Sequence, residues 1–417
     1  MRVSCLHVTS HPELDDREGM FLMLKARTLG NQPRGTKYAE CHRLLVWGKL
    51  KNILNNLKGE KDWQCNILDE LLSMRDGTVT TDLDLKYNEI KYMLNQVSTD
   101  FLLVLHCEGP SVPHTVLYSI PDGEVVFYIH SNPQLQILTS KMAWPIIKTF
   151  RVRLEDGAAA KVQLSIPPEY ENNDGKTYPV LVSAPGPPGE QMINHKWHVN
   201  WNTYLATNKS WVVVEIDGRG SGGQELGLIF QPSWQLGKLE ALDYLQVTRY
   251  LISELKFLDN SRVAVWGWGH AGFNAITTLA ADHHATLSCA ASVATPTDWT
   301  QYSSYYSEKY MGSSNVVPGG NFRGYEETSL LNRAGELRNR TLMLLHGTAD
   351  IDVHYSHSLR LTKELTKYNA LFRAQAYTDE GHDLKGVQHH LYSTMEIFLQ
   401  SCFPPYTQDE IDLATGT

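Results

Sequence analysis

The stretch Val263–Ala281, VAVWGWGHAGFNAITTLAA, joins an apolar run, a tight turn of small residues and a helix-like pattern. The run is short and rich in β-branched and aromatic residues, which is typical of a buried strand. Gly267, Gly269 and Gly272 then match G-x-G-x-x-G, the pattern of a dinucleotide-binding turn. A serine at position 269 would instead give G-W-S-H-A-G, close to the turn that carries a hydrolase nucleophile. The stretch therefore predicts strand, turn and helix, with two competing functions.

The composition of the whole chain is that of an ordinary globular protein. It has 417 residues, of which 42% are hydrophobic and 20% charged, so one large domain or two domains are expected. The net charge of −9 argues against binding of nucleic acid, which requires a clustered basic face. No apolar run approaches the roughly 18 residues of a membrane helix, and the first residues contain no apolar segment of a signal peptide.

The pattern of strands changes along the chain. FLLVLHC, HTVLYSI and EVVFYIH, between residues 101 and 130, predict an antiparallel meander that could be part of a propeller blade. From about Tyr178, amphipathic stretches separate buried-type strands. In two of these stretches the apolar residues recur at helical spacing, which predicts an apolar helix face: Leu239, Leu242, Leu245, Ile252 and Leu255 in the first, and Leu391, Met395, Phe398 and Leu399 in the second. The strands are YPVLVSA, WVVVEID, RVAVWG, LSCAASVA, TLMLLHG and FRAQAYTD. Such alternation predicts an α/β fold, a mostly parallel sheet with helices on both faces.

The dinucleotide-binding interpretation requires an acidic residue about 20 positions after the first glycine, where it would hold a ribose. After the next predicted strand the first acid is Asp298, about ten residues late. A second match, Gly218–Gly223, is followed by glycine and proline residues that prevent an immediate helix. Nucleotide binding is therefore the least favoured of the functions considered.

The hydrolase interpretation requires an acid and then a histidine, each in a loop after a strand. Asp350 follows TLMLLHG, and His382 follows FRAQAYTDEG. A single loop aspartate or histidine is usually only solvated. Two of them in the required order after the required strands favour a hydrolase.

Five further motifs carry a family resemblance. HGTADIDVHYSHS, YTDEGHD, DGRGSG, WGWGHAG and YYSEKYMG resemble the dipeptidyl peptidase four branch of the prolyl oligopeptidase family, over roughly residues 101–403. HHLYST and DEGH look closest to the non-enzymatic dipeptidyl-peptidase-like proteins six and ten. The resemblance implies the last part of a β-propeller over 1–146, an α/β-hydrolase domain over 147–405 and a flexible tail over 406–417. The earlier propeller blades and the membrane anchor of the family have no counterpart here, so the chain looks like a fragment or a shortened form.

The resemblance also implies that the catalytic machinery is degenerate. The active relatives carry G-W-S-Y-G-G, and Gly269 occupies the nucleophile position, so Asp350 and His382 would form a pair with no hydroxyl to activate. The relatives carry an oxyanion-stabilising tyrosine in a Y-A-G-P loop, and Pro185 in SAPGPPGEQ occupies that position. Loss of one such donor costs about 10²–10³ in rate.

Remnants of a substrate pocket are implied at four positions. Tyr302 and Tyr306 match aromatic residues that line the proline-side pocket of the peptidases, and Trp268 and Val353 match further pocket positions. Core packing is the alternative role for these side chains. Asp352 replaces an asparagine of the active members and adds a charge near the catalytic acid position.

The resemblance implies disulfides as well. Cys289 and Cys402 match the disulfide of the family's hydrolase domain, with two buried free thiols as the alternative. Cys107 matches a propeller cysteine, for which Cys65 is the first choice of partner and Cys41 the second. No C-x-x-C pair is present, so a zinc ribbon is not expected and neither metal nor cofactor is predicted.

The resemblance therefore predicts a catalytically inactive, extracellular glycoprotein that acts through protein contacts, with glycans at Asn208 and Asn339. The named relatives are accessory subunits of A-type voltage-gated potassium channels. A serine-type dipeptidyl peptidase that removes X-Pro dipeptides is the alternative, and a nucleotide-binding protein is the third. A homodimer is also expected, through Tyr392, Glu396 and Gln400 on the final helix.

Overall fold

A computed structural model describes most of the chain. The described ranges are 20–23, 90–97, 100–119, 125–172, 175–223 and 226–403. They divide into two compact units: Met1–Met142 with Asn194–His198, and Ala143–Ile193 with Val199–Thr417. The boundary predicted at residues 146–147 stays a prediction, and the tail predicted over 406–417 lies outside the described residues.

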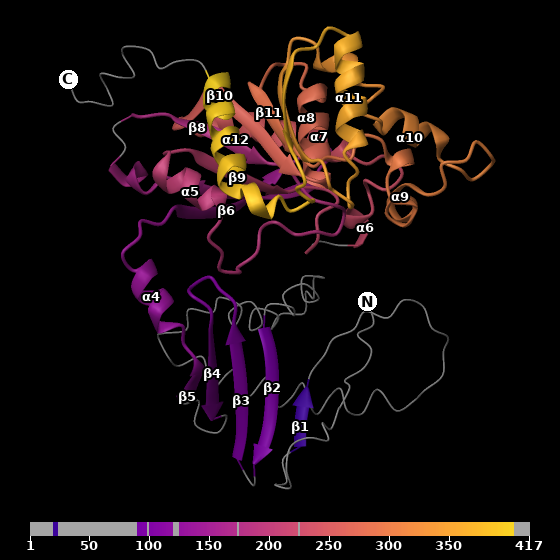
Figure 1. Ribbon diagram of the computed structural model, residues 1–417. Helices are drawn as coiled ribbons and strands as arrows, with labels where there is room; N and C mark the ends of the chain where they lie inside the picture. Colours follow the sequence, from indigo (N-terminus) through magenta and orange to yellow (C-terminus); the bar gives the residue numbers. More distant parts are fainter. Residues whose placement is uncertain are drawn as a thin grey trace. The chain divides into compact units, whose positions relative to one another are not determined.

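The first unit contains a five-stranded antiparallel sheet in the order β1-β2-β3-β4-β5 (Figure 1). Its strands are β1 Met20–Met23, β2 Ile90–Val97, β3 Asp100–Cys107, β4 His114–Ser119 and β5 Val125–His130, and helix α4 Pro133–Thr139 follows. The three β-rich runs of the sequence form β3, β4 and β5. Each pairs with the next in antiparallel register, so the predicted meander is present.

The second unit is an α/β-hydrolase domain built on one eight-stranded sheet, in the order β13-β12-β11-β10-β8-β9-β7-β6. Its strands are β6 Ile146–Arg153, β7 Ala159–Ile166, β8 Tyr178–Ser183, β9 Val212–Asp217, β10 Leu258–Trp268, β11 Cys289–Val293, β12 Thr341–Gly347 and β13 Phe372–Tyr377. β7 pairs antiparallel with both β6 and β9, and all other pairings are parallel. The carboxyl ends of β10, β12 and β13 therefore meet at one edge of the sheet.

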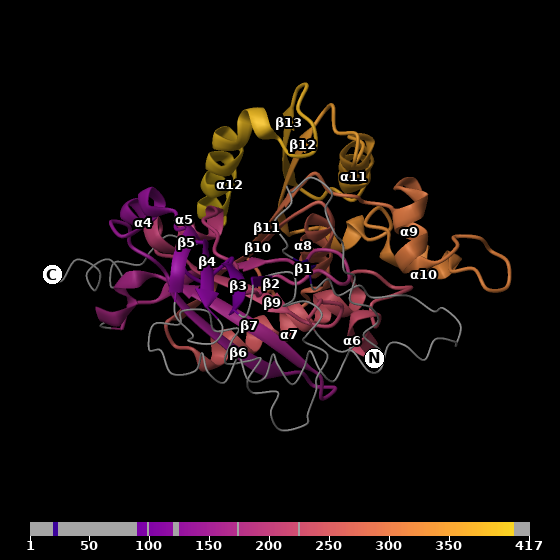
Figure 2. The same cartoon turned by 90° about the horizontal axis from the view of Figure 1, so that it is seen from below.

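Helices cover both faces of this sheet (Figures 1 and 2). One face packs against α7 Lys238–Glu254, α8 His270–Ala281 and α11 Ser356–Lys367, and the other against α5 Trp201–Asn208 and α12 Gln388–Cys402. The shorter helices are α6 Leu226–Ile229, α9 Ser304–Met311 and α10 Phe322–Thr328, with 3-10 turns at η2 Pro168–Asn172, η3 Trp299–Gln301, η4 Ala334–Leu337 and η5 Lys385–Val387. Among the helices described, none has the length and apolar character needed to cross a membrane.

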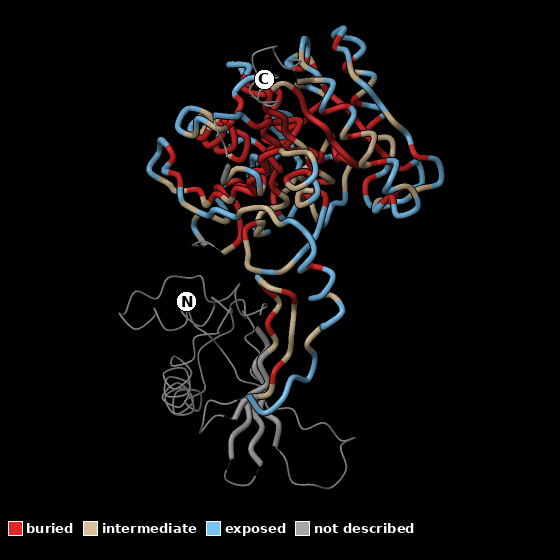
Figure 3. The backbone as a smooth tube through the Cα atoms, turned by 90° about the vertical axis from the view of Figure 1, so that its left-hand side faces the viewer, coloured by how far each residue is buried: buried red, intermediate tan, exposed pale blue. Residues whose placement is uncertain are grey.

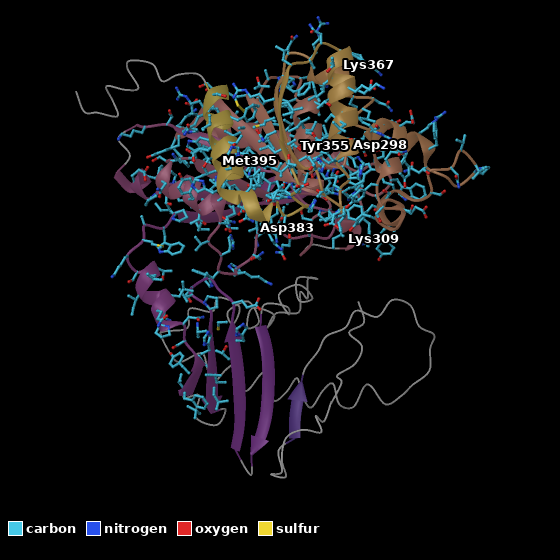
Figure 4. The ribbon with its side chains drawn as sticks, viewed as in Figure 1. Asp298, Lys309, Tyr355, Lys367, Asp383 and Met395 are labelled. Atoms are coloured by element: carbon cyan, nitrogen blue, oxygen red, sulfur yellow. A yellow bond between two sulfur atoms is a disulfide. The ribbon has the colours of Figure 1, made fainter. Side chains whose placement is uncertain are left out.

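The core lies in the middle of the second unit (Figure 3). All residues of β8, β9 and β11 are buried, as expected for strands covered on both sides. The predicted apolar face of α12 also lies against the sheet, because Leu391, Met395, Phe398 and Leu399 are at most 1% exposed (Met395 is labelled in Figure 4).

Helix α7 follows the leucine pattern of its sequence except at Leu242. Leu242, predicted on the apolar face, is 51% exposed, whereas Asp243 is fully buried. The reason is Arg219, in the turn after β9, whose guanidinium and backbone N–H both bind the Asp243 carboxylate. An ion pair between the helix and this turn thus buries Asp243, while its neighbour Leu242 faces outward.

Candidate active site

The strand, turn and helix predicted for Val263–Ala281 are β10, Gly269 and α8. Gly269 has φ 59° and ψ −121°, a conformation that is strained for residues with a side chain. A Cβ at Gly267 would collide with the Ala271 backbone, so only glycine fits there. The sequence thus folds into a sharp turn that presents position 269 at the amino end of α8.

Gly269, Asp350 and His382 come together at the carboxyl ends of β10, β12 and β13. A Cβ added to Gly269 would lie 3.5 Å from Nε2 of His382. On the other side of the imidazole, Nδ1 of His382 lies 2.8 Å from Oδ2 of Asp350. Serine hydrolases use the same spatial order, in which a nucleophile is followed by a base and then by an acid that orients the base. Here the first position has no hydroxyl.

Asp350 is held as a carboxylate by four contacts. Its Oδ1 accepts the backbone N–H groups of Asp352 and Val353, each at 2.9 Å. Its Oδ2 accepts from His382 and lies 3.3 Å from Nε2 of His346. Burial acts to raise the pKa of Asp350, but the hydrogen bonds outweigh it and hold this pKa well below its ordinary value.

His346 is a member of the site that the sequence analysis missed. It is buried at the end of β12, where Nδ1 lies 2.7 Å from Oγ of Ser358 and Nε2 lies 2.8 Å from the carbonyl oxygen of Val353. Only a donor can bind both that carbonyl and the Asp350 carboxylate, so Nε2 carries the proton and Nδ1 accepts from the serine hydroxyl. The histidine of HGTAD, four residues before the acid, was the available signal.

His382 is the base of the site. Its hydrogen bond to Asp350 raises its pKa, burial opposes this shift, and the charges of Asp350, Asp352 and Asp383 add to the rise. Asp383, the next residue in the loop before α12, is labelled in Figure 4. Trp268 at the end of β10 donates from Nε1 to the His382 carbonyl oxygen at 3.1 Å, which fixes this loop against the nucleophile turn.

Pro185 lies in the loop after β8, where its carbonyl oxygen accepts a hydrogen bond from Nδ2 of Asn274 at 2.9 Å. Its ring has no donor to offer an oxyanion. A side chain at Gly186 would collide with the carboxylate of Glu190, so that acid packs directly on the same loop. The sequence analysis did not detect this carboxylate next to the position that the resemblance assigns to the oxyanion donor, where a negative charge would oppose the formation of an oxyanion.

Two of the four predicted pocket residues, Tyr302 and Tyr306, form an aromatic cluster with Trp299. The rings of Tyr302 and Tyr306 lie 5.1 Å apart, and Trp299 stacks on Tyr306 at 5.8 Å. Val353 is buried, and Trp268 lies edge-on to His382 at 6.5 Å. Burial is the main cause of a raised pKa for Tyr302, followed by the charges of Asp352 and Asp350. The charge of Asp352, which replaces the asparagine of the active relatives, thus acts on a residue of the predicted pocket.

His270 follows the nucleophile position and points into the same cluster. Its Nδ1 lies 2.8 Å from the Tyr306 hydroxyl, and its Nε2 has no hydrogen-bond partner within the described part of the chain. Burial lowers the pKa of His270 to about 3, so the ring is neutral. A buried neutral imidazole directed at Tyr306 does not replace the lost nucleophile.

Asp350, Asp352 and His382 offer ligand atoms within 4.8 Å of one another, close enough to consider a metal ion. However, both oxygens of Asp350 already accept hydrogen bonds, and Nδ1 of His382 is used by one of them. That leaves Asp352 and Nε2 of His382, fewer than the three or four protein ligands of a zinc site. The donor set therefore suits an acid–base pair better than a metal.

Cys289 on β11 and Cys402 at the end of α12 are joined by a disulfide, with a sequence separation of 113 and Cα atoms 6.1 Å apart. Cys107 is also disulfide-bonded, and the partners predicted for it, Cys65 and Cys41, lie outside the described residues. Asn208 and Asn339 are both exposed.

Comparison with known proteins identifies the family. The family model described as "Prolyl oligopeptidase family" matches residues 197–405, half of the chain. The chain belongs to the prolyl oligopeptidase family. It is 33% identical over 298 residues to a venom dipeptidyl peptidase 4 of Apis mellifera and 31% identical over 301 residues to dipeptidyl peptidase 4 of Bos taurus. Each match covers 72% of this chain but only 38% of the relative, so the chain spans well under half of their length.

Solved structures give the same fold. The crystal structure of Porphyromonas gingivalis dipeptidyl peptidase 4 aligns with a TM-score of 0.65 at 21% identity, over 75% of this chain and 46% of that chain. At this identity the match establishes the α/β-hydrolase fold alone. The relatives named above are peptidases, so the expected closeness to the non-enzymatic proteins six and ten stays a prediction.

Proposed function

We propose that this protein is a catalytically inactive member of the dipeptidyl peptidase branch that acts through protein contacts. One observation carries the proposal: position 269, whose side chain would face Nε2 of His382, is a glycine. Without an oxygen there, no acyl-enzyme can form. Pro185 and Glu190 support the proposal, because they leave the oxyanion side without a tyrosine donor and place a carboxylate there.

The test is direct. Purified protein should neither cleave an X-Pro chromogenic substrate nor be labelled by a serine-directed phosphonate. Stoichiometric labelling of any serine would reject the proposal in favour of the alternative, a serine-type dipeptidyl peptidase that removes X-Pro dipeptides. The intact Asp350–His382 pair and the aromatic cluster around Tyr306 are the observations that favour this alternative.

We further propose that the full-length protein is extracellular, glycosylated at Asn208 and Asn339, and an accessory subunit of a voltage-gated potassium channel. This part rests on the resemblance to proteins six and ten. Co-expression with an A-type channel subunit should alter channel gating and allow co-purification. Normal gating without co-purification would remove the channel from the proposal.

A homodimer through α12 is also proposed, but through a different face from the one the sequence indicated. Tyr392 packs on Trp201 of α5 at 5.4 Å, and Glu396 forms an ion pair with Lys209. These residues serve the fold of one chain. Ile397 is 64% exposed on the same helix and is the better candidate for an apolar contact.

Ile397→Asp should therefore convert a dimer into a monomer at micromolar concentration without loss of folding, because an exposed isoleucine contributes nothing to the core. Light scattering measures the mass, and circular dichroism checks the fold. Leu359→Asp on α11, also exposed at 54%, is the matched control and should leave the dimer intact. A parent protein that is already monomeric would reject this interface.

A further inference from the structure

The acid–base pair of the site keeps its geometry although position 269 has no hydroxyl. Nδ1 of His382 is bound to Asp350, and Asp350 is in turn fixed by two backbone N–H groups. Nε2 of His382 makes no hydrogen bond to any residue that the structure describes. The imidazole is thus oriented by its carboxylate with one nitrogen available to accept a proton, which is the arrangement of a general base.

His382 is the one described side chain close to the point where a side chain at position 269 would begin. Apart from chain neighbours, the described atoms within 4 Å of a Cβ added to Gly269 are Nε2 and Cε1 of His382, at 3.5 and 3.7 Å. Both are ordinary van der Waals distances. No described side chain other than His382 therefore fills the region into which a serine side chain at position 269 would project, and a water molecule that enters this region can donate a hydrogen bond to Nε2.

Helix α8 supports negative charge at the same point. It has twelve residues and begins at His270, directly after Gly269, so the unpaired N–H groups of its first turn lie beside the reacting position. Loss of the tyrosine donor at Pro185 weakens this stabilisation, and the Glu190 carboxylate opposes it. The remaining stabilisation suits an ester with a good leaving group rather than an amide.

We propose that His382, oriented by Asp350, is a general base that activates water for direct hydrolysis of activated acyl esters beside Gly269. The proposal goes beyond the proposed function, because it limits the inactivity to the cleavage of peptide bonds, and it rests on the premise of that function that no serine nucleophile operates. Nε2 takes a proton from water while the water oxygen forms a bond to the acyl carbon. The tetrahedral intermediate then expels the alcohol oxygen, which takes the proton from Nε2. One ester and one water yield one acid and one alcohol, without an acyl-enzyme.

The experiment uses p-nitrophenyl acetate and the whole chain. We expect steady hydrolysis without a burst, and His382→Ala should lower the enzyme-dependent rate about 100-fold, the lower end of typical general-base contributions. His389→Ala, an exposed histidine on α12, is the matched control and should leave the rate unchanged. Thermal unfolding of each variant confirms that it folds.

The pH profile provides a second readout. The rate should rise with pH as His382 loses its proton, with a midpoint above that of free imidazole. Asp350 and Asp352 from the loop after β12, and Asp383 from its own loop, are the charged groups that face His382, and all three favour its protonated form. Asp352→Asn should move the midpoint down while leaving the folded state intact.

The outcomes separate this inference from the proposed function. An unchanged rate in His382→Ala would assign the activity to surface groups and overturn the inference alone. Mass spectrometry that finds an acetyl group on His382 would show nucleophilic attack by the imidazole and would overturn it too. A burst with a serine labelled by phosphonate would instead reject the proposed function.

Discussion

Two regions of the candidate active site differ in the catalytic features that they contain. One is the nucleophile turn at Gly269, and the other is the pair of acid–base loops that carry Asp350 and His382. The turn at Gly269 retains its backbone shape but carries no reacting atom. The loops after β12 and β13 retain both reacting side chains and their spacing, with Asp350 and His382 2.8 Å apart. The shape of the turn is set by steric contacts of its glycines, so its chemistry can be lost without disturbing the fold. The acid–base pair is set by hydrogen bonds that also hold the loops together.

Gly269→Ser is the sharpest test of this difference and has the largest expected effect. If the turn has lost only its hydroxyl, the new serine should be labelled by a phosphonate that does not label the parent. Turnover of an X-Pro substrate should stay about 10²–10³-fold below that of an active relative, because Pro185 supplies no donor. Mass spectrometry of the labelled protein measures the first effect and a chromogenic assay the second.

The matched control is the double variant Gly269→Ser with His382→Ala, which should not be labelled because the serine has no base. Labelling of this double variant would show that the acid–base pair plays no part in activating position 269. The acid–base loops could then no longer be regarded as the part of the site that keeps its chemical function.

A second test compares the glycines of the turn by stability. Gly267→Ala should cost about 3 kcal/mol, the upper end of overpacking effects, because its Cβ would collide with backbone that cannot move aside. Gly269→Ala should cost only about 1–2 kcal/mol, the conformational penalty of a positive φ, because its Cβ makes only ordinary van der Waals contacts with His382. Urea unfolding of both variants measures the difference. Equal losses would show that sterics do not decide which positions of the turn can vary.

The sequence was sufficient for the sheet and for the order of the site residues. Apolar runs between helical patterns mark β8 to β13, and the order Gly269, Asp350, His382 places the site at the ends of three of these strands. Each strand is marked by residues next to one another in the chain, and each site residue is marked by the strand directly before it. Both kinds of signal are therefore local.

What the sequence analysis missed depends on partners distant in sequence. Asp243 is buried because Arg219 reaches it from another turn, and Tyr392 is covered because Trp201 lies opposite on α5. No periodicity records such contacts, so the burial of Asp243 and the partial covering of Tyr392 could not be expected from the sequence.

The smallest expected effect is a shift in the titration of His382, and it tests whether the acid–base loops are as intact as the geometry indicates. The hydrogen bond to Asp350 raises the pKa of His382, against the effect of burial. Asp350→Asn removes the charge and should lower this pKa toward or below its ordinary value of about 6.5. Asp352→Asn, an exposed acid of the same loop, is the control and should lower the pKa less.

The sign of the linked stability follows from the direction of the shift. A raised pKa means that the protonated imidazole stabilises the folded state below its unfolded pKa, and that this contribution disappears as pH rises through the folded pKa. The stability gap between the parent and Asp350→Asn should therefore be wider at pH 5 than at pH 9. Nuclear magnetic resonance titration gives the pKa, and urea unfolding at the two pH values gives the gap. A pKa of His382 that is unchanged by Asp350→Asn would mean that the two residues do not act as a pair in solution. The acid–base loops would then be no better preserved than the turn at Gly269.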